Sequence, residues 1–79
     1  MKTIYKYDTG HIQLPKGAKI LKAGMQGGEV KIWAEVDSSQ PTEERKVFVY
    51  GTGHLIPENA CYIDTVFDTL FVWHVYEVL

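Results

Sequence analysis

Apolar and polar residues alternate with a period of two along much of this 79-residue chain. The clearest example runs from residue 29 to residue 37, where one face would carry Val30, Ile32, Ala34 and Val36. Such alternation is typical of a strand that is buried on one face, and no apolar stripe with a period of 3.6 residues persists over the length of a helix. The sequence therefore predicts an all-β fold.

Turn signals divide the chain into about seven short strands. The expected strands are residues 2–7, 11–14, 19–26, 29–37, 46–50, 60–67 and 70–78. The turn at 8–10 predicts a hairpin between the first two strands. Gly27 and Gly28 suit a tight turn between the third and fourth, and residues 67–70 would join the last two. We expect a small antiparallel meander, barrel or two-sheet sandwich.

Residues 38–45 are all polar and are expected to form the main loop, with room for one helical turn after Pro41. The chain is short enough for one domain over residues 1–79. Below roughly 80 residues a hydrophobic core barely outweighs the ordering entropy, so such domains often rely on disulfides, metals or self-association. The single Cys61 excludes an internal disulfide. An efficient β core or an oligomer is therefore expected.

Composition also bears on location and partners. The longest apolar run, residues 70–79, is broken by His74 and Glu77 and has about half of the ~20 residues that a membrane-spanning helix needs. The start of the chain lacks the apolar core of a signal peptide. The formal net charge of -2 argues against nucleic-acid binding, which depends on a basic surface. A soluble cytoplasmic protein is the expectation.

The stretch from Tyr50 to Pro57 is the best candidate for a binding loop. Gly51 and Gly53 permit positive φ and can leave backbone N–H groups open, while Thr52 and His54 add polar side chains. Two interpretations stay open: a simple bend between strands, or a cradle for a phosphate or carboxylate. The phosphate-loop lysine and the longer dinucleotide fingerprint are absent, so nucleotide hydrolysis is not predicted.

Trp33 breaks the alternation of the clearest strand, because it lies among charged residues on the polar face. Its ring could cover the aliphatic stems of neighbouring Lys and Glu side chains. Alternatively it could be a contact residue, since Trp is enriched at interface hot spots. It is therefore a second candidate binding residue.

The last expected strand is apolar on both faces, which indicates a central, covered strand or a subunit contact. In so short a chain few elements remain to cover a second face. We expect self-association through the face that carries Val72, His74 and Tyr76. His74 itself is expected to be a hydrogen-bonded core histidine rather than a ligand or a base.

No catalytic signature places a nucleophile beside a base. Cys61 lies within a strand pattern and is expected to be a small core residue, and the spacing of His11, His54 and His74 does not indicate a metal site. A non-enzymatic protein without cofactor or metal is expected.

Motifs spread over nearly the whole chain resemble a family of small proteins from bacteriophages and prophages. They are LPKGAKI at 14–20, MQGG at 25–28, IWAEVD at 32–37, YGTGH at 50–54, IP at 56–57 and FVWHV at 71–75. That family is a domain of unknown function, so the resemblance implies a phage origin and supplies no catalytic residues.

Together these features predict a phage accessory protein in the host cytoplasm. It would bind a host macromolecule, as a host-takeover or anti-defence inhibitor, through Trp33 and the loop from Gly51 to Pro57. Two alternatives stay open. One is an oligomeric sponge for an anionic small ligand such as a signalling nucleotide, and the other is a minor structural or assembly component of the virion.

Overall fold

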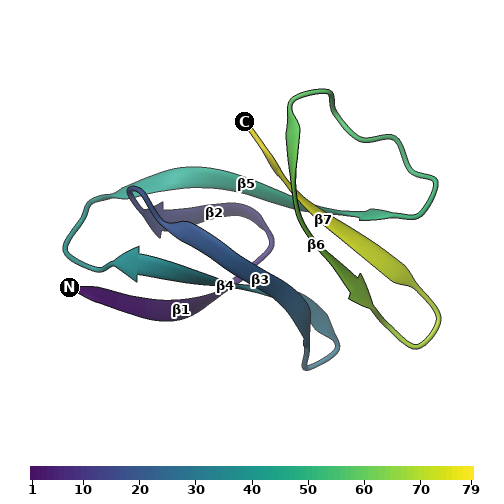
Figure 1. Ribbon diagram of the computed structural model, residues 1–79, viewed down its shortest axis with the longest axis horizontal. Coiled ribbons are helices and arrows are strands. Elements are labelled where there is room, and N and C mark those ends of the chain that lie inside the picture. The colour runs from purple at the N-terminus through teal and green to yellow at the C-terminus, as the bar shows by residue number, and fades with distance from the viewer.

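The computed structural model describes all 79 residues and contains seven strands and no helix (Figure 1). The strands are β1 (Lys2–Asp8), β2 (Gly10–Pro15), β3 (Lys19–Gln26), β4 (Glu29–Asp37), β5 (Thr42–Gly51), β6 (Ala60–Phe67) and β7 (Val72–Val78). The prediction of an all-β fold of about seven antiparallel strands is confirmed. Without any helix, the structure holds none that could span a membrane.

The strands form two antiparallel sheets that do not close into a barrel. Sheet A has the order β1-β4-β3, and sheet B has the order β2-β5-β7-β6 (Figure 1). Of the expected arrangements, the two-sheet one is correct. A meander is excluded, because only β3–β4 and β6–β7 are neighbours both in sequence and in a sheet.

The expected opening hairpin is wrong. β1 pairs with β4 in sheet A, whereas β2 pairs with β5 in sheet B. Only Thr9 separates β1 from β2, and the commonest tight hairpins need two loop residues. Gly10, with a φ of 107°, lets the chain turn the corner from one sheet to the other. The turn signal at residues 8–10 therefore marks this corner.

Of the other expected connections, the two later hairpins are confirmed and the helical turn is not. β3 and β4 form the expected hairpin, with Gly27 and Gly28 at φ values of 62° and 80°. β6 and β7 also pair, and Asp68 N–H donates to the Phe71 carbonyl in their turn at 2.8 Å. The helical turn after Pro41 is wrong, because β5 already begins at Thr42 and its first residues pair with β2.

The inner faces of the two sheets form a small core. Ten residues of 79 are buried, which agrees with the limited core of a chain this short. One cluster consists of Ala23, Ile32, Val47, Val66 and Val75, and the other of Leu14, Ala18, Ala34 and Val36. The apolar face expected for residues 29–37 supplies members of both clusters.

A paired Arg45 and Glu77 lie on the inner face of sheet B. The guanidinium donates from Nη2 to Glu77 Oε1 at 2.8 Å, and Nε also pairs with the same carboxylate. Its Nη1 donates to the Ala18 carbonyl at 3.0 Å. The hydrogen bond to Glu77 raises the pKa of Arg45. This bidentate ion pair satisfies two charges that would otherwise be costly to bury.

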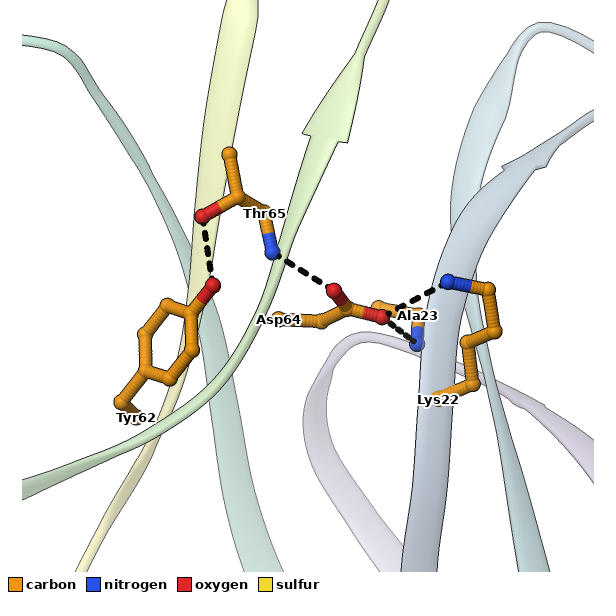
Figure 2. Close-up of polar contacts among 5 residues, drawn as sticks. All are labelled: Lys22, Ala23, Tyr62, Asp64 and Thr65. Atoms are coloured by element: carbon orange, nitrogen blue, oxygen red, sulfur yellow. Dashed lines mark hydrogen bonds and ion pairs between the residues drawn. The ribbon is translucent and has the colours of Figure 1, made fainter.

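The open edges of the two sheets, β3 and β6, meet at a seam that Asp64 holds together (Figure 2). Asp64 Oδ2 accepts hydrogen bonds from Ala23 N–H and Lys22 Nζ, each at 3.1 Å, and Oδ1 accepts one from Thr65 N–H at 2.9 Å. Each strand has a bulge here, at Ile20/Lys22 and Tyr62/Asp64. Such bulges re-aim a side chain, and here a carboxylate takes the place of a backbone ladder.

Candidate functional site

The outer face of sheet B carries a group of aromatic and hydroxyl side chains, which we call the aromatic face. Strand register places Phe48, Tyr76 and Tyr62 in one row across β5, β7 and β6. The next row contains Tyr50, His74 and Thr65. Because side chains alternate between the faces of a strand, both rows point away from the core.

Aromatic contacts link these rows. Tyr76 lies edge-to-face with both Tyr62 and Tyr50, with ring centroids 5.5 and 6.0 Å apart. At the β2 side His11 lies edge-to-face with Phe48 at 5.4 Å. Edge-to-face pairs at such distances are favourable. Tyr62 nevertheless keeps 58% of its surface exposed, while Phe48, Tyr50 and Tyr76 are half-buried.

A chain of polar contacts runs through His74 and ties the glycine loop to this face. Thr52 Oγ1 lies 3.0 Å from His74 Nε2, and His74 Nδ1 lies 3.3 Å from Thr65 Oγ1. The Thr65 hydroxyl then contacts the Tyr62 hydroxyl at 2.7 Å, a contact visible in Figure 2. Both ring nitrogens of His74 therefore have partners, which fixes the orientation of the ring.

The glycine loop has a defined geometry. His54 N–H donates to the Gly51 carbonyl at 3.1 Å, and Gly53 has a φ of 90°, as in a type II turn, whose third position favours glycine. His54 Nδ1 accepts the Gly51 N–H at 3.2 Å. A Cβ on Gly51 would lie only 3.0 Å from the His54 ring. Gly51 is therefore needed because the histidine folds back over it.

The segment after the loop stays open to solvent. Leu55 is 95% exposed and Ile56 39% exposed, while the Pro57 carbonyl accepts the Ala60 N–H at 3.1 Å. Exposed apolar side chains of this kind, beside an aromatic face, are typical of interaction sites.

Trp33 lies elsewhere. It is half-buried on the outer face of sheet A, opposite Lys6 and Lys22 in the strand register. Its ring packs over Gly24, where a Cβ would lie 3.6 Å from Cζ3. The outer faces of sheets A and B point in opposite directions. The structure therefore does not bring Trp33 together with the glycine loop.

The residues expected for self-association do share a face. Val72, His74 and Tyr76 lie on the outer side of β7, a central strand flanked by β5 and β6. The inner side of β7 packs in the core through Val75. His74 is thus not a core histidine. It joins the predicted binding loop, through Thr52, to the predicted association strand.

Sequence reasoning missed Phe48, Tyr62 and Thr65 as members of this site, and it included Tyr50 only as the first residue of the candidate loop. Alternation already put Phe48 and Tyr50 on one face, but their proximity to β6 depends on a strand order that the sequence does not reveal. The face offers aromatic surface, hydroxyl groups and imidazole nitrogens. These are groups that recognise a partner by packing and hydrogen bonding.

Comparisons with known proteins supply a family. No curated protein and no solved structure matches the chain. A family model described as a domain of unknown function (DUF7352) matches residues 1–79, the whole of the chain. The chain therefore belongs to this family of domains of unknown function.

Proposed function

We propose that the protein is a non-enzymatic binding module that contacts a protein partner through the aromatic face and the adjoining glycine loop. One observation carries this proposal: Thr52, His74, Thr65 and Tyr62 form a continuous chain of contacts that joins loop and face into one surface. Tyr62 is exposed at the end of that chain.

The chemistry of this surface suits a protein partner. Tyrosine and tryptophan are enriched at protein interfaces, because they combine a large apolar ring with a polar group. The aromatic face presents three tyrosines on adjacent strands together with Phe48. It is a sheet surface rather than an enclosed pocket, which favours a macromolecule over a small ligand.

Pre-organisation supports the same conclusion. Binding costs free energy when side chains must be ordered at the interface. His74 is held at both ring nitrogens, and His54 is held by the Gly51 amide. Side chains that are already fixed lose little entropy on binding, so these contacts favour a surface built for recognition.

The motif resemblance to phage and prophage proteins supports a finer proposal. In this proposal the module acts in the cytoplasm of a bacterial host and blocks a host enzyme or a defence component. The compact size and the absence of a recognisable catalytic signature fit a stoichiometric inhibitor.

Affinity purification tests the proposal. The tagged protein is used as bait in a lysate of a bacterial host, beside Tyr62→Ala and His54→Ala variants whose folding is checked by circular dichroism. We expect at least one host protein to be enriched by the wild type and lost with both variants. Equal recovery with wild type and variants would refute the aromatic face as the binding surface.

Trp33→Ala is the matched control, because it removes an aromatic side chain from the opposite side of the molecule. Partner recovery should survive this change. If Trp33→Ala abolishes recovery while Tyr62→Ala does not, the interface lies on sheet A.

A second candidate rests on the loop amides. The amides of Gly51 and His54 are engaged within the turn, whereas those of Thr52 and Gly53 make no hydrogen bond within the chain. Free amides in a turn can hold an anion. In this alternative, copies associate through Val72, His74 and Tyr76, and each loop takes an anionic ligand such as a nucleotide. Thermal-shift measurements with nucleotides test it, and no shift at millimolar concentration would exclude it.

A further inference from the structure

Strand β1 forms an open edge of sheet A, and nothing in the chain protects this edge from pairing with another strand. Natural sheets protect their edges with bulges, prolines, charged side chains or covering elements. The edges at β3 and β6 are bulged and meet at the Asp64 seam. The edge at β2 ends at Pro15, which has no N–H to offer to another strand. β1 has seven residues in unbroken register with β4 and contains neither a bulge nor a proline.

Side chains on β1 do not shield this edge. Lys2, which would be expected to guard it, pairs with Glu35 on β4 at 3.5 Å. Lys6 reaches across β4 to the Gln26 side chain on β3. Meanwhile Ile4 and Tyr5 are 58% and 48% exposed. Lys2 and Lys6 thus make their contacts on the outer face of the sheet, and the exposed Ile4 and Tyr5 lie next to the unpaired backbone groups of β1.

We propose that two copies of this chain associate through antiparallel pairing of their β1 strands, with Tyr5 opposite Tyr5 at the two-fold axis. This register places Lys2 opposite Asp8 of the second copy, twice by symmetry. It places Ile4 opposite Lys6, whose aliphatic stem can pack on the isoleucine. The two three-stranded sheets would then form one continuous sheet.

Charge complementarity selects this register among the alternatives. A shift by one residue would turn the core face of one copy toward the outer side of the other. A shift of the centre to Ile4 would place Lys2 opposite Lys6, and a shift to Lys6 would place the two Lys6 side chains opposite each other. Like charges directly opposite destabilise a strand pair. Only the register centred on Tyr5 pairs all seven residues of β1 without a like-charge pair.

The proposal does not depend on the aromatic face, because β1 and the outer face of sheet B lie on different sheets. Failure of one proposal therefore leaves the other standing. The exposed Tyr5 side chains of the two copies would come together on the side of the sheet that faces the core, adding apolar burial to a small core.

Sedimentation equilibrium of the whole protein measures the dimer directly. We expect a concentration-dependent monomer–dimer equilibrium for the wild type. Ile4→Lys places like charges opposite Lys6 twice and should weaken the dimer about tenfold. Ile4→Glu removes the same apolar group but places opposite charges there, so it should weaken the dimer less than Ile4→Lys or tighten it. A wild type that stays monomeric up to millimolar concentration overturns the proposal, as does an equal effect of the two variants.

Cysteine cross-linking tests the register. In a Cys61→Ser background, Tyr5→Cys places two thiols directly opposite each other, at a Cα separation of about 4.5–5.5 Å that a disulfide can span. Mild oxidation should therefore produce a covalent dimer. Ile4→Cys is the matched control, because the two thiols would be diagonal and should cross-link more slowly. Faster cross-linking through Ile4→Cys would overturn the proposed register.

Discussion

The outer faces of the two sheets arise from the same alternation of side chains, but sheet A carries charged groups there and sheet B carries aromatic rings and hydroxyl groups. On sheet A, Lys31 lies between Asp8 and Glu29, and Lys2 pairs with Glu35. On sheet B the corresponding positions hold aromatic rings and hydroxyl groups around His74. Surface ion pairs such as those on sheet A contribute little to stability and keep that face hydrated. The aromatic face leaves apolar surface open that the chain itself does not cover.

The difference suggests different roles for the two outer faces: a hydrated surface on sheet A and a binding surface on sheet B. A face covered by mutually satisfied charges has no need of a partner, and Trp33 is packed among them with Gly24 beneath its ring. A face of half-buried rings with an exposed Tyr62 gains free energy when a partner buries it. The comparison is open to experiment, because each face can be altered separately.

The largest effect is expected when a core residue of sheet A is compared with a residue of the aromatic face on sheet B. Ile32 is fully buried in the core of sheet A, and Ile32→Ala should cost about 2–5 kcal/mol. In a small domain this is a large part of the total stability. Tyr62→Ala on the aromatic face should cost clearly less. Urea unfolding measures both. A loss for Tyr62→Ala as large as that for Ile32→Ala would mean that the aromatic face stabilises the fold rather than binding a partner.

The next effect concerns the seam that joins the sheets. Burial by itself raises the pKa of Asp64, but the hydrogen bonds from Ala23 N–H, Lys22 and Thr65 N–H outweigh it and leave the pKa below its usual value. Asp64→Asn removes the charge and turns an amide N–H₂ toward a donor. It should cost about 1–3 kcal/mol near neutral pH. Glu58→Gln, in an exposed loop, is the control with the same change in charge.

The pH dependence of this loss has a defined sign. Because the folded pKa of Asp64 is lowered, its stabilisation is present above the ordinary carboxyl pKa of about 3.9 and is lost as pH falls through the lower, folded value. The stability difference between wild type and Asp64→Asn should therefore shrink in acid. A difference that is constant with pH would show that the charge of Asp64 does not hold the seam.

Sequence reasoning recovered the parts of this fold that depend on local pattern. The alternation of 29–37 and the glycine pair at 27–28 correctly predicted β4 and the β3–β4 hairpin, because both depend on neighbouring residues. The turn at 8–10 misled, because a corner between sheets and a hairpin use the same turn residues. Long-range pairing decides between them. The same holds for the site: local patterns indicate Thr52 and His74 one by one, whereas the contact between them depends on strand order.

Adding a single methyl group to one glycine beside each face tests the next difference between them. Gly51→Ala places a Cβ about 3.0 Å from the His54 ring, so the ring must move and the hydrogen bond from Gly51 N–H is lost. We expect a cost of about 1 kcal/mol and a changed His54 ring signal in the NMR spectrum. Gly24→Ala on sheet A meets only an ordinary contact with Trp33 at 3.6 Å. It should be neutral or slightly stabilising. If both variants behave alike, the loop is not held by His54.

A smaller effect is expected from Thr52→Val, which keeps the shape of the side chain and removes its hydroxyl contact with His74. Because this contact is exposed, the loss of stability should be about 0.5 kcal/mol. Hydrogen exchange of the loop amides should nevertheless become faster, since the loop loses its tie to the aromatic face. Thr42→Val, at an exposed position of β5, provides the control. Unchanged exchange in Thr52→Val would show that the loop is held without His74.

The smallest effect is expected on sheet A, from Lys31→Gln. The ion pairs of Lys31 lower the pKa of Asp8 and are mirrored by a raised pKa of Lys31 itself. The carboxylates of Asp8 and Glu29 stay largely exposed to water, so their Coulomb attraction to Lys31 is screened and the entropy of holding long side chains opposes it. Stability should fall by less than in Thr52→Val, and added salt should reduce even that difference. A larger and salt-independent loss, measured by urea unfolding, would mean that the charged face is as structural as the core beneath it. In that case the contrast with the aromatic face would no longer separate a hydrated surface from a binding one.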